Sequence, residues 1–147
     1  MPTAIPAPIR IAARFLPALA WMAFLFALSA RSRLPTPLGL TADTVAALGH
    51  LGVYAVLAVL LWRAIPPGRW NRFRFVLAFL GAMAFGVGDE AHQAFVPGRE
   101  PSLLDLGLDA AGAVGGLAAV AVVRSWRERG VAGGTDHQTV SPPNAGD

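Results

Sequence analysis

Four apolar stretches of about 20 residues each dominate this chain of 147 residues. A helix needs about 20 largely apolar residues to cross the hydrocarbon core of a bilayer. The stretches cover residues 11–30, 45–65, 75–95 and 103–123. They are rich in Ala and Leu and do not alternate between polar and apolar positions, which disfavours β-strands. The sequence therefore predicts an all-α, integral membrane four-helix bundle.

Composition agrees with a chain whose surface faces lipid. Charged residues make up 14% and hydrophobic residues 54%, whereas a soluble domain usually carries about 25% charged residues. Cysteine is absent, which excludes disulfides, thiol catalysis and cysteine-based metal sites. All basic residues are arginines in short flanks between apolar stretches, and the net charge is only +3. This pattern is typical of membrane topology signals, so we expect no nucleic-acid partner.

The arginines also predict an orientation. With the N-terminus inside, nine arginines lie in cytoplasmic segments, and only Arg31, Arg33 and Arg99 lie outside. The positive-inside rule therefore favours N-in/C-in. We expect residues 1–10 to form a cytoplasmic N-terminus, residues 11–123 the transmembrane domain, and residues 124–147 a cytoplasmic, disordered tail that is rich in Gly and Pro.

The first apolar stretch has a second interpretation. Arg10 and Arg14, the apolar run and the small residues near Ser29 also fit a signal peptide with its cleavage site. Cleavage would remove the first helix and leave the orientation of the other three unchanged. Residues 1–30 are therefore either a retained helix or a cleaved signal.

Polar residues enter the last three spans at one depth, toward the predicted outer side. Residues three or four apart share a helix face, which pairs polar side chains on each of these spans. We expect them to turn inward, with Arg99 as counter-ion and Ser102 capping the fourth helix, while Asp89 lies at the surface. The candidate binding residues or polar network are His50, Tyr54, Glu90, Gln93, Arg99, Ser102, Asp105 and Asp109.

The fourth span also carries small residues at steps of four. Such residues let a neighbouring helix backbone approach closely. Gly112 and Gly116 continue roughly the face of Asp105 and Asp109. A second ladder is a candidate surface for a helix partner and consists of Gly107, Ala111, Gly115 and Ala119.

Three chemical alternatives apply to the polar cluster. Carboxylates of this kind serve in acid–base catalysis or bind divalent metals, and two histidines, His50 and His92, are candidates for the axial ligands of a haem. No nucleophile accompanies the carboxylates, and His92 points away from the face of Glu90 and Gln93. We therefore interpret the cluster as a hydrogen-bonded network and expect no metal and no cofactor.

One run of sequence resembles a known family. The segment DEAHQAFVPGREPSLLDLGLDAAGAVGG, preceded by the His50-x-x-x-Tyr54 helix, is similar to the signature of VanZ-like membrane proteins. The resemblance covers roughly residues 46–116. The chain departs from the family pattern at Ala46-Ala47, where the family often has Asp-Lys, and at Asp109, where it usually has Asn.

The resemblance implies a multi-pass protein of the bacterial cytoplasmic membrane with a link to the cell envelope. The family takes its name from a glycopeptide-resistance cluster and is linked to teicoplanin tolerance. Its partners would be the lipid bilayer and an envelope precursor or lipid head group bound at the polar outer mouth. Two alternatives stay open: a membrane enzyme acting on a lipid-linked envelope precursor, with Glu90 or Asp109 as general base, and a structural assembly subunit.

Overall fold

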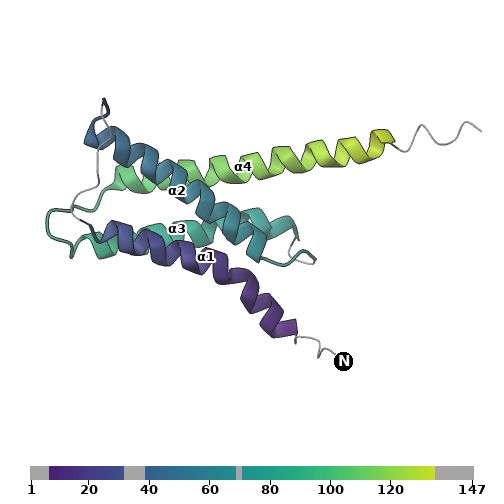
Figure 1. Ribbon diagram of the computed structural model, residues 1–147, viewed down its shortest axis with the longest axis horizontal. Helices are drawn as coiled ribbons and strands as arrows, with labels where there is room; N and C mark the ends of the chain where they lie inside the picture. Colours follow the sequence, from purple (N-terminus) through teal and green to yellow (C-terminus); the bar gives the residue numbers. More distant parts are fainter. Residues whose placement is uncertain (1–6, 32–38, 69–70, 135–147) are drawn as a thin grey trace, which may run out of the picture. The chain divides into compact units, whose positions relative to one another are not determined.

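The computed structural model describes residues 7–31, 39–68 and 71–134. Within these ranges the chain forms four α-helices and one short 3-10 helix, with no β-strand (Figure 1). The α-helices are α1 (Ala7–Ser29), α2 (Ala42–Ala64), α3 (Arg74–Gln93) and α4 (Leu103–Gly134), and the 3-10 helix η1 (Asn71–Phe73) precedes α3. Each α-helix is long and apolar enough to cross a membrane. The predicted all-α, four-span architecture is confirmed.

Helix ends lie within four residues of the predicted spans, with α1 beginning at Ala7 inside the predicted N-terminal segment, and the end of α4 is the exception. This helix begins at Leu103 as predicted but runs to Gly134. The first residues of the predicted tail are therefore helical, because Arg124, Arg127 and Glu128 are good helix formers. Arg33, Arg69, Trp70 and residues 135–147 lie outside the described residues.

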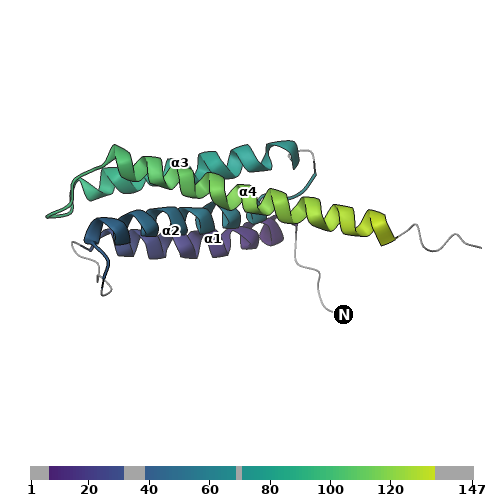
Figure 2. The same cartoon turned by 90° about the horizontal axis from the view of Figure 1, so that it is seen from above.

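The helices form two compact units, residues 1–117 and 118–147. In the first unit, α1, α2 and α3 lie beside one another (Figure 2). Its core consists mainly of small or aliphatic side chains: Leu25, Tyr54, Leu57, Ala58, Ala78, Ala82, Ala113 and Leu117. The second unit contains the C-terminal part of α4, where Arg124 lies 3.5 Å from Glu128, four residues on.

Large apolar side chains point outward from the helices of the first unit. Leu48, Leu80 and Val87 are each more than half exposed. A protein surrounded by water rarely shows so much exposed aliphatic surface on every helix. Lipid chains around the helices account for it, which agrees with a multi-pass membrane protein.

Two glycines of α4 set its distance from α2. A Cβ at Gly116 would lie 2.5 Å from the carbonyl oxygen of Ala55, and one at Gly112 would collide with the carbonyl of Leu51. By contrast, nothing lies within 4 Å of a Cβ placed at Gly107 or Gly115. Within the bundle, α4 therefore packs through the face of Asp109, and the ladder of Gly107, Ala111, Gly115 and Ala119 is not the packed face.

Alanine substitutions at two neighbouring glycines should distinguish the packed face of α4 from the unpacked one. Gly116→Ala should lower the free energy of unfolding by about 2 kcal/mol, because the added methyl forces α4 away from the α2 backbone. Gly115→Ala is the matched control and should leave stability unchanged or slightly higher, since helix propensity favours Ala. Denaturant-induced unfolding in detergent measures both. Equal stability of the two variants would contradict the close contact.

Candidate functional site

One end of the bundle gathers most of the acidic side chains. At this end, which we call the polar end, α1 and α3 finish and α2 and α4 begin. Asp89, Glu90 and Asp109 are each less than one-tenth exposed there. Charged groups inside an apolar bundle are costly unless other groups of the protein satisfy them. Each of these three carboxylates accepts a hydrogen bond from a segment other than its own helix.

Asp89 ties α3 to α1. The Ser29 hydroxyl donates to Asp89 Oδ1 at 2.6 Å, and the Gln93 amide donates to Oδ2 at 3.1 Å. Asp89 is only 8% exposed. The expectation that Asp89 lies at the surface was wrong. That expectation rested only on the helix face that Glu90 shares with Gln93. In the structure, α1 packs against the other side of α3 and brings Ser29 to Asp89.

Asp109 ties α4 to α2. Its Oδ1 lies 2.7 Å from His50 Nδ1, and because a carboxylate only accepts, the imidazole N–H donates. His50 Nε2 lies 3.8 Å from Asp105 Oδ2. Asp109 is 1% exposed, so its end of this hydrogen bond is buried, while His50 is partly exposed. The predicted inward turn of His50 and Asp109 is therefore present in the structure.

Glu90 ties α3 to the start of α4. Its Oε2 accepts a hydrogen bond from the backbone N–H of Ser102 at 2.7 Å. The Ser102 hydroxyl in turn accepts from the backbone N–H of Asp105 at 3.3 Å, which is the predicted helix cap. Gly98 has a φ of 79° and gives the connecting loop the tight turn that brings Ser102 back over α3.

Tyr54 occupies the centre of the bundle below His50. The two rings are nearly parallel, with centroids 6.4 Å apart. A Cβ at Gly86 would lie 3.3 Å from the Tyr54 ring and 3.2 Å from Asp109 Oδ2, so glycine there lets α3 approach both residues. The Tyr54 hydroxyl and Asp109 Oδ2 are buried and have no hydrogen-bond partner among the described residues. Tyr54 is a predicted member of the polar network, and among the described residues no hydrogen bond joins its hydroxyl to a carboxylate.

A cleft of about 70 Å³ opens between α1, α2 and α3 at the polar end. This volume accommodates a few water molecules or part of a small polar group. Both apolar and polar side chains line it. The lining residues are Leu25, Leu28, Ser29, Ala46, Gly49, His50, Val53, Tyr54, Asp89, Gln93 and Arg99. Of the eight predicted site residues, His50, Tyr54, Gln93 and Arg99 line the cleft, while Glu90, Ser102, Asp105 and Asp109 do not.

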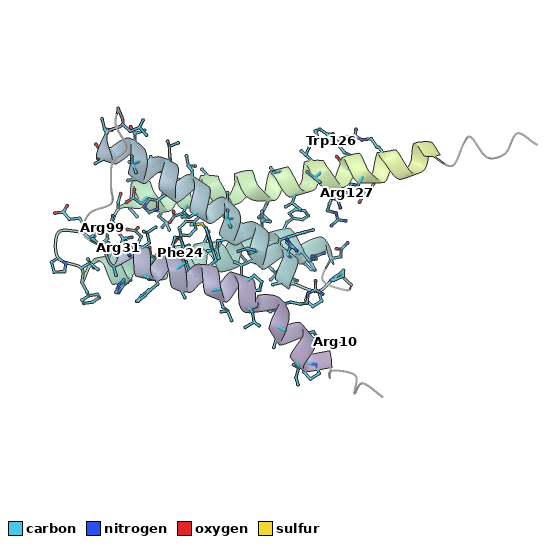
Figure 3. The ribbon with its side chains drawn as sticks, viewed as in Figure 1. Arg10, Phe24, Arg31, Arg99, Trp126 and Arg127 are labelled. Carbon is cyan, nitrogen blue, oxygen red and sulfur yellow. The ribbon has the colours of Figure 1, made fainter. Side chains whose placement is uncertain are left out.

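Arg99 lies beside Arg31 at the polar end (Figure 3). Its Nε donates to the backbone carbonyl of Arg31 at 3.3 Å. Within the described part of the chain, no carboxylate forms an ion pair with Arg99. The predicted role of Arg99 as counter-ion was therefore wrong, because the carboxylates find closer donors in His50 and Ser29 and in the Ser102 backbone.

The cluster does not have the geometry of a metal centre. In the ranges that the structure describes, no group of three or more His, Asp or Glu could hold a metal ion. The two histidines proposed as haem ligands have different surroundings. His50 is bonded to Asp109, whereas the His92 ring stacks on Phe26 at 4.2 Å between centroids.

The bond between Ser29 and Asp89 should carry measurable coupling. Ser29→Ala and Asp89→Asn should each destabilise the protein, and the double variant should lose less than their sum. The expected coupling is about 1.5–3 kcal/mol, the range for hydrogen bonds to charged groups. A double-mutant cycle by unfolding in detergent measures it. Strict additivity would show that the two side chains do not interact.

Comparison with known proteins identifies the family. No curated protein and no solved structure matches the chain. The family model described as VanZ/LLP1 matches residues 8–124, which covers α1 except its first residue, all of α2 and α3, and most of α4. The matched region contains every side chain of the polar end and the glycines on which its packing depends. The chain therefore belongs to the VanZ/LLP1 family.

Proposed function

We propose that this VanZ-family protein resides in the bacterial cytoplasmic membrane with both termini inside, so that the polar end faces outward. The distribution of arginines supports this orientation, since nine of them lie in the segments assigned to the cytoplasm. The cleft then opens toward the cell envelope. His50, eight residues into α2, lies about 12 Å below the start of that helix.

The polar end binds the anionic head group of an envelope molecule. One observation carries this proposal: Arg99 lines the cleft without a carboxylate partner among the described residues, while His50, Ser29 and Gln93 form the hydrogen bonds to Asp109 and Asp89. A guanidinium with free terminal nitrogens forms two parallel hydrogen bonds to phosphate or carboxylate. The cleft therefore offers a positive charge to a ligand, although acidic residues surround it.

The other lining residues would contact different parts of the ligand. Leu25, Leu28 and Val53 are apolar lining residues, against which the first carbons of a lipid chain would pack. His50 and Tyr54 also line the cleft. A ligand with an anionic group next to a hydrocarbon chain fits this arrangement.

A catalytic role is the second candidate, and one observation favours it. The buried Asp109 carboxylate orients the His50 imidazole, which is the arrangement that enzymes use to position a general base. His50 would then be the base and Asp109 its positioning residue. Glu90 is less suited to this role than the sequence indicated, because its Oε2 is held by the Ser102 backbone. If His50→Gln lost biological activity while keeping head-group binding, this candidate would be favoured.

The orientation has a direct test, because the natural chain contains no cysteine. Glu100→Cys and Pro67→Cys each place one thiol at an exposed position, at opposite ends of the bundle. In intact cells a membrane-impermeant maleimide should label the cysteine at position 100 and leave the one at position 67 unlabelled. Permeabilised cells should show labelling of both. The reverse pattern in intact cells would overturn the outward placement of the polar end.

The head-group proposal is tested through Arg99. In a susceptible bacterium that expresses the chain, we expect increased teicoplanin tolerance, which Arg99→Gln should abolish at equal membrane levels of protein. Purified Arg99→Gln should also bind a polyprenyl phosphate in detergent about tenfold more weakly than the natural protein does. Arg31→Gln is the matched control, since it removes the same charge at the same end and keeps the carbonyl bonded to Arg99. If Arg99→Gln bound polyprenyl phosphate as tightly as the control, Arg99 would not be the recognition residue.

A further inference from the structure

A second cleft lies at the opposite end of the first unit, outside the site described above. We call this the arginine end, where α1 begins, α2 finishes and α3 begins. The cleft has a volume of about 500 Å³, within the range of sites that bind small molecules. Its lining contains one arginine from each of three helices, Arg14, Arg63 and Arg74, together with Pro17, Leu60 and Trp62. None of these lining residues is acidic.

The bend of α1 gives this cleft its shape. Pro17 lies inside α1 and lacks the N–H that the helix would bond at that position. Figure 1 shows α1 bending away from α2 in its N-terminal half. Proline is a common cause of such bends. The separation leaves space between the start of α1 and the adjoining ends of α2 and α3.

Arg14 and Arg74 are held in place by hydrogen bonds to backbone carbonyls at the end of α2. Arg14 Nη2 donates to the backbone carbonyl of Arg63 at 2.9 Å. Arg74 Nη2 donates to the carbonyl of Trp62 at 2.8 Å, and its guanidinium lies 4.2 Å from the centre of the Trp62 ring. Arg74 is only 6% exposed, whereas Arg14 and Arg63 are exposed. A buried anchor therefore fixes the inner wall, and two accessible guanidiniums face the surroundings.

We infer that this cleft at the arginine end is a binding site for the phosphate of an anionic phospholipid head group. Its position at the ends of membrane-spanning helices is the depth at which lipid phosphates lie. Basic pockets between transmembrane helices bind such head groups, and arginine forms a two-pronged contact with phosphate. The inference does not depend on the function of the polar end or on the orientation of the chain.

The test uses the full chain purified in detergent, titrated with phosphatidylglycerol or with phosphatidylcholine of the same acyl chains and followed by native mass spectrometry. Each exposed arginine near a lipid phosphate contributes about fivefold in affinity. Arg14→Gln with Arg63→Gln should therefore weaken phosphatidylglycerol binding about 25-fold, and each single substitution about fivefold. Phosphatidylcholine, whose head group has no net charge, should bind weakly to every variant.

A matched variant controls for net charge. Arg127→Gln with Arg129→Gln removes the same two charges from exposed positions of α4 that do not line the cleft. This control should bind phosphatidylglycerol as the natural protein does. Equal binding by the cleft variant and the control would overturn the inference. So would equally tight binding of phosphatidylcholine, or binding of inorganic phosphate alone with the same dependence on Arg14 and Arg63. The single substitutions decide the matter if the double variant fails to fold.

Discussion

Carboxylates that lie within membrane-spanning helices must be satisfied by the protein itself, and this constraint organises the bundle. An ionised acid in lipid costs about 2.5–3.5 kcal/mol near the middle of a span. Here each buried acid finds its donor on another segment: Asp89 on α1, Asp109 on α2, and Glu90 at the start of α4. The groups that would otherwise oppose insertion therefore tie the helices together at one end.

Close approach of the helices makes these short hydrogen bonds geometrically accessible. Gly112 and Gly116 bring the α4 backbone against α2, and Gly86 leaves room for Tyr54 and Asp109. Alanines fill the core at the contacts. In lipid there is little hydrophobic drive between helices, so packing of small residues and hydrogen bonds between helices supply the stability. The hydrogen bonds of the polar end therefore depend on the close packing at Gly112 and Gly116, and α4 contributes residues to both.

The features that belong to single helices were predictable from the sequence. Span length and composition were sufficient to place α2 and α3 and the start of α4, because the thickness of a bilayer sets both. Spacing along α2 and α4 was sufficient to place His50 and Asp109 on inward faces. The pattern also anticipated the Ser102 cap, since a hydroxyl residue at a helix start has a local partner.

Features that depend on how helices meet were not predictable from one sequence. Asp89 is buried because α1 happens to place Ser29 against it, and no local pattern connects these residues. Two glycine ladders on α4 had equal spacing, and only the position of α2 decides which one is packed. Charge alone suggested that Arg99 pairs with the carboxylates. In the structure a nearer donor, His50, bonds to Asp109, and Arg99 donates to the backbone carbonyl of Arg31. The arginine cleft likewise appears only when Arg14, Arg63 and Arg74 from three helices come together.

The hydrogen bond between His50 and Asp109 represents the central claim that hydrophilic side chains converge inside a lipid-embedded bundle. Solid-state NMR of the protein in lipid bilayers, with ¹⁵N-labelled histidine and ¹³C-labelled aspartate, measures this contact directly. The account predicts a strong dipolar coupling between His50 Nδ1 and the carboxyl carbon of Asp109, because Nδ1 and Oδ1 lie 2.7 Å apart. A His50 signal without coupling to any aspartate carboxyl carbon would contradict the account.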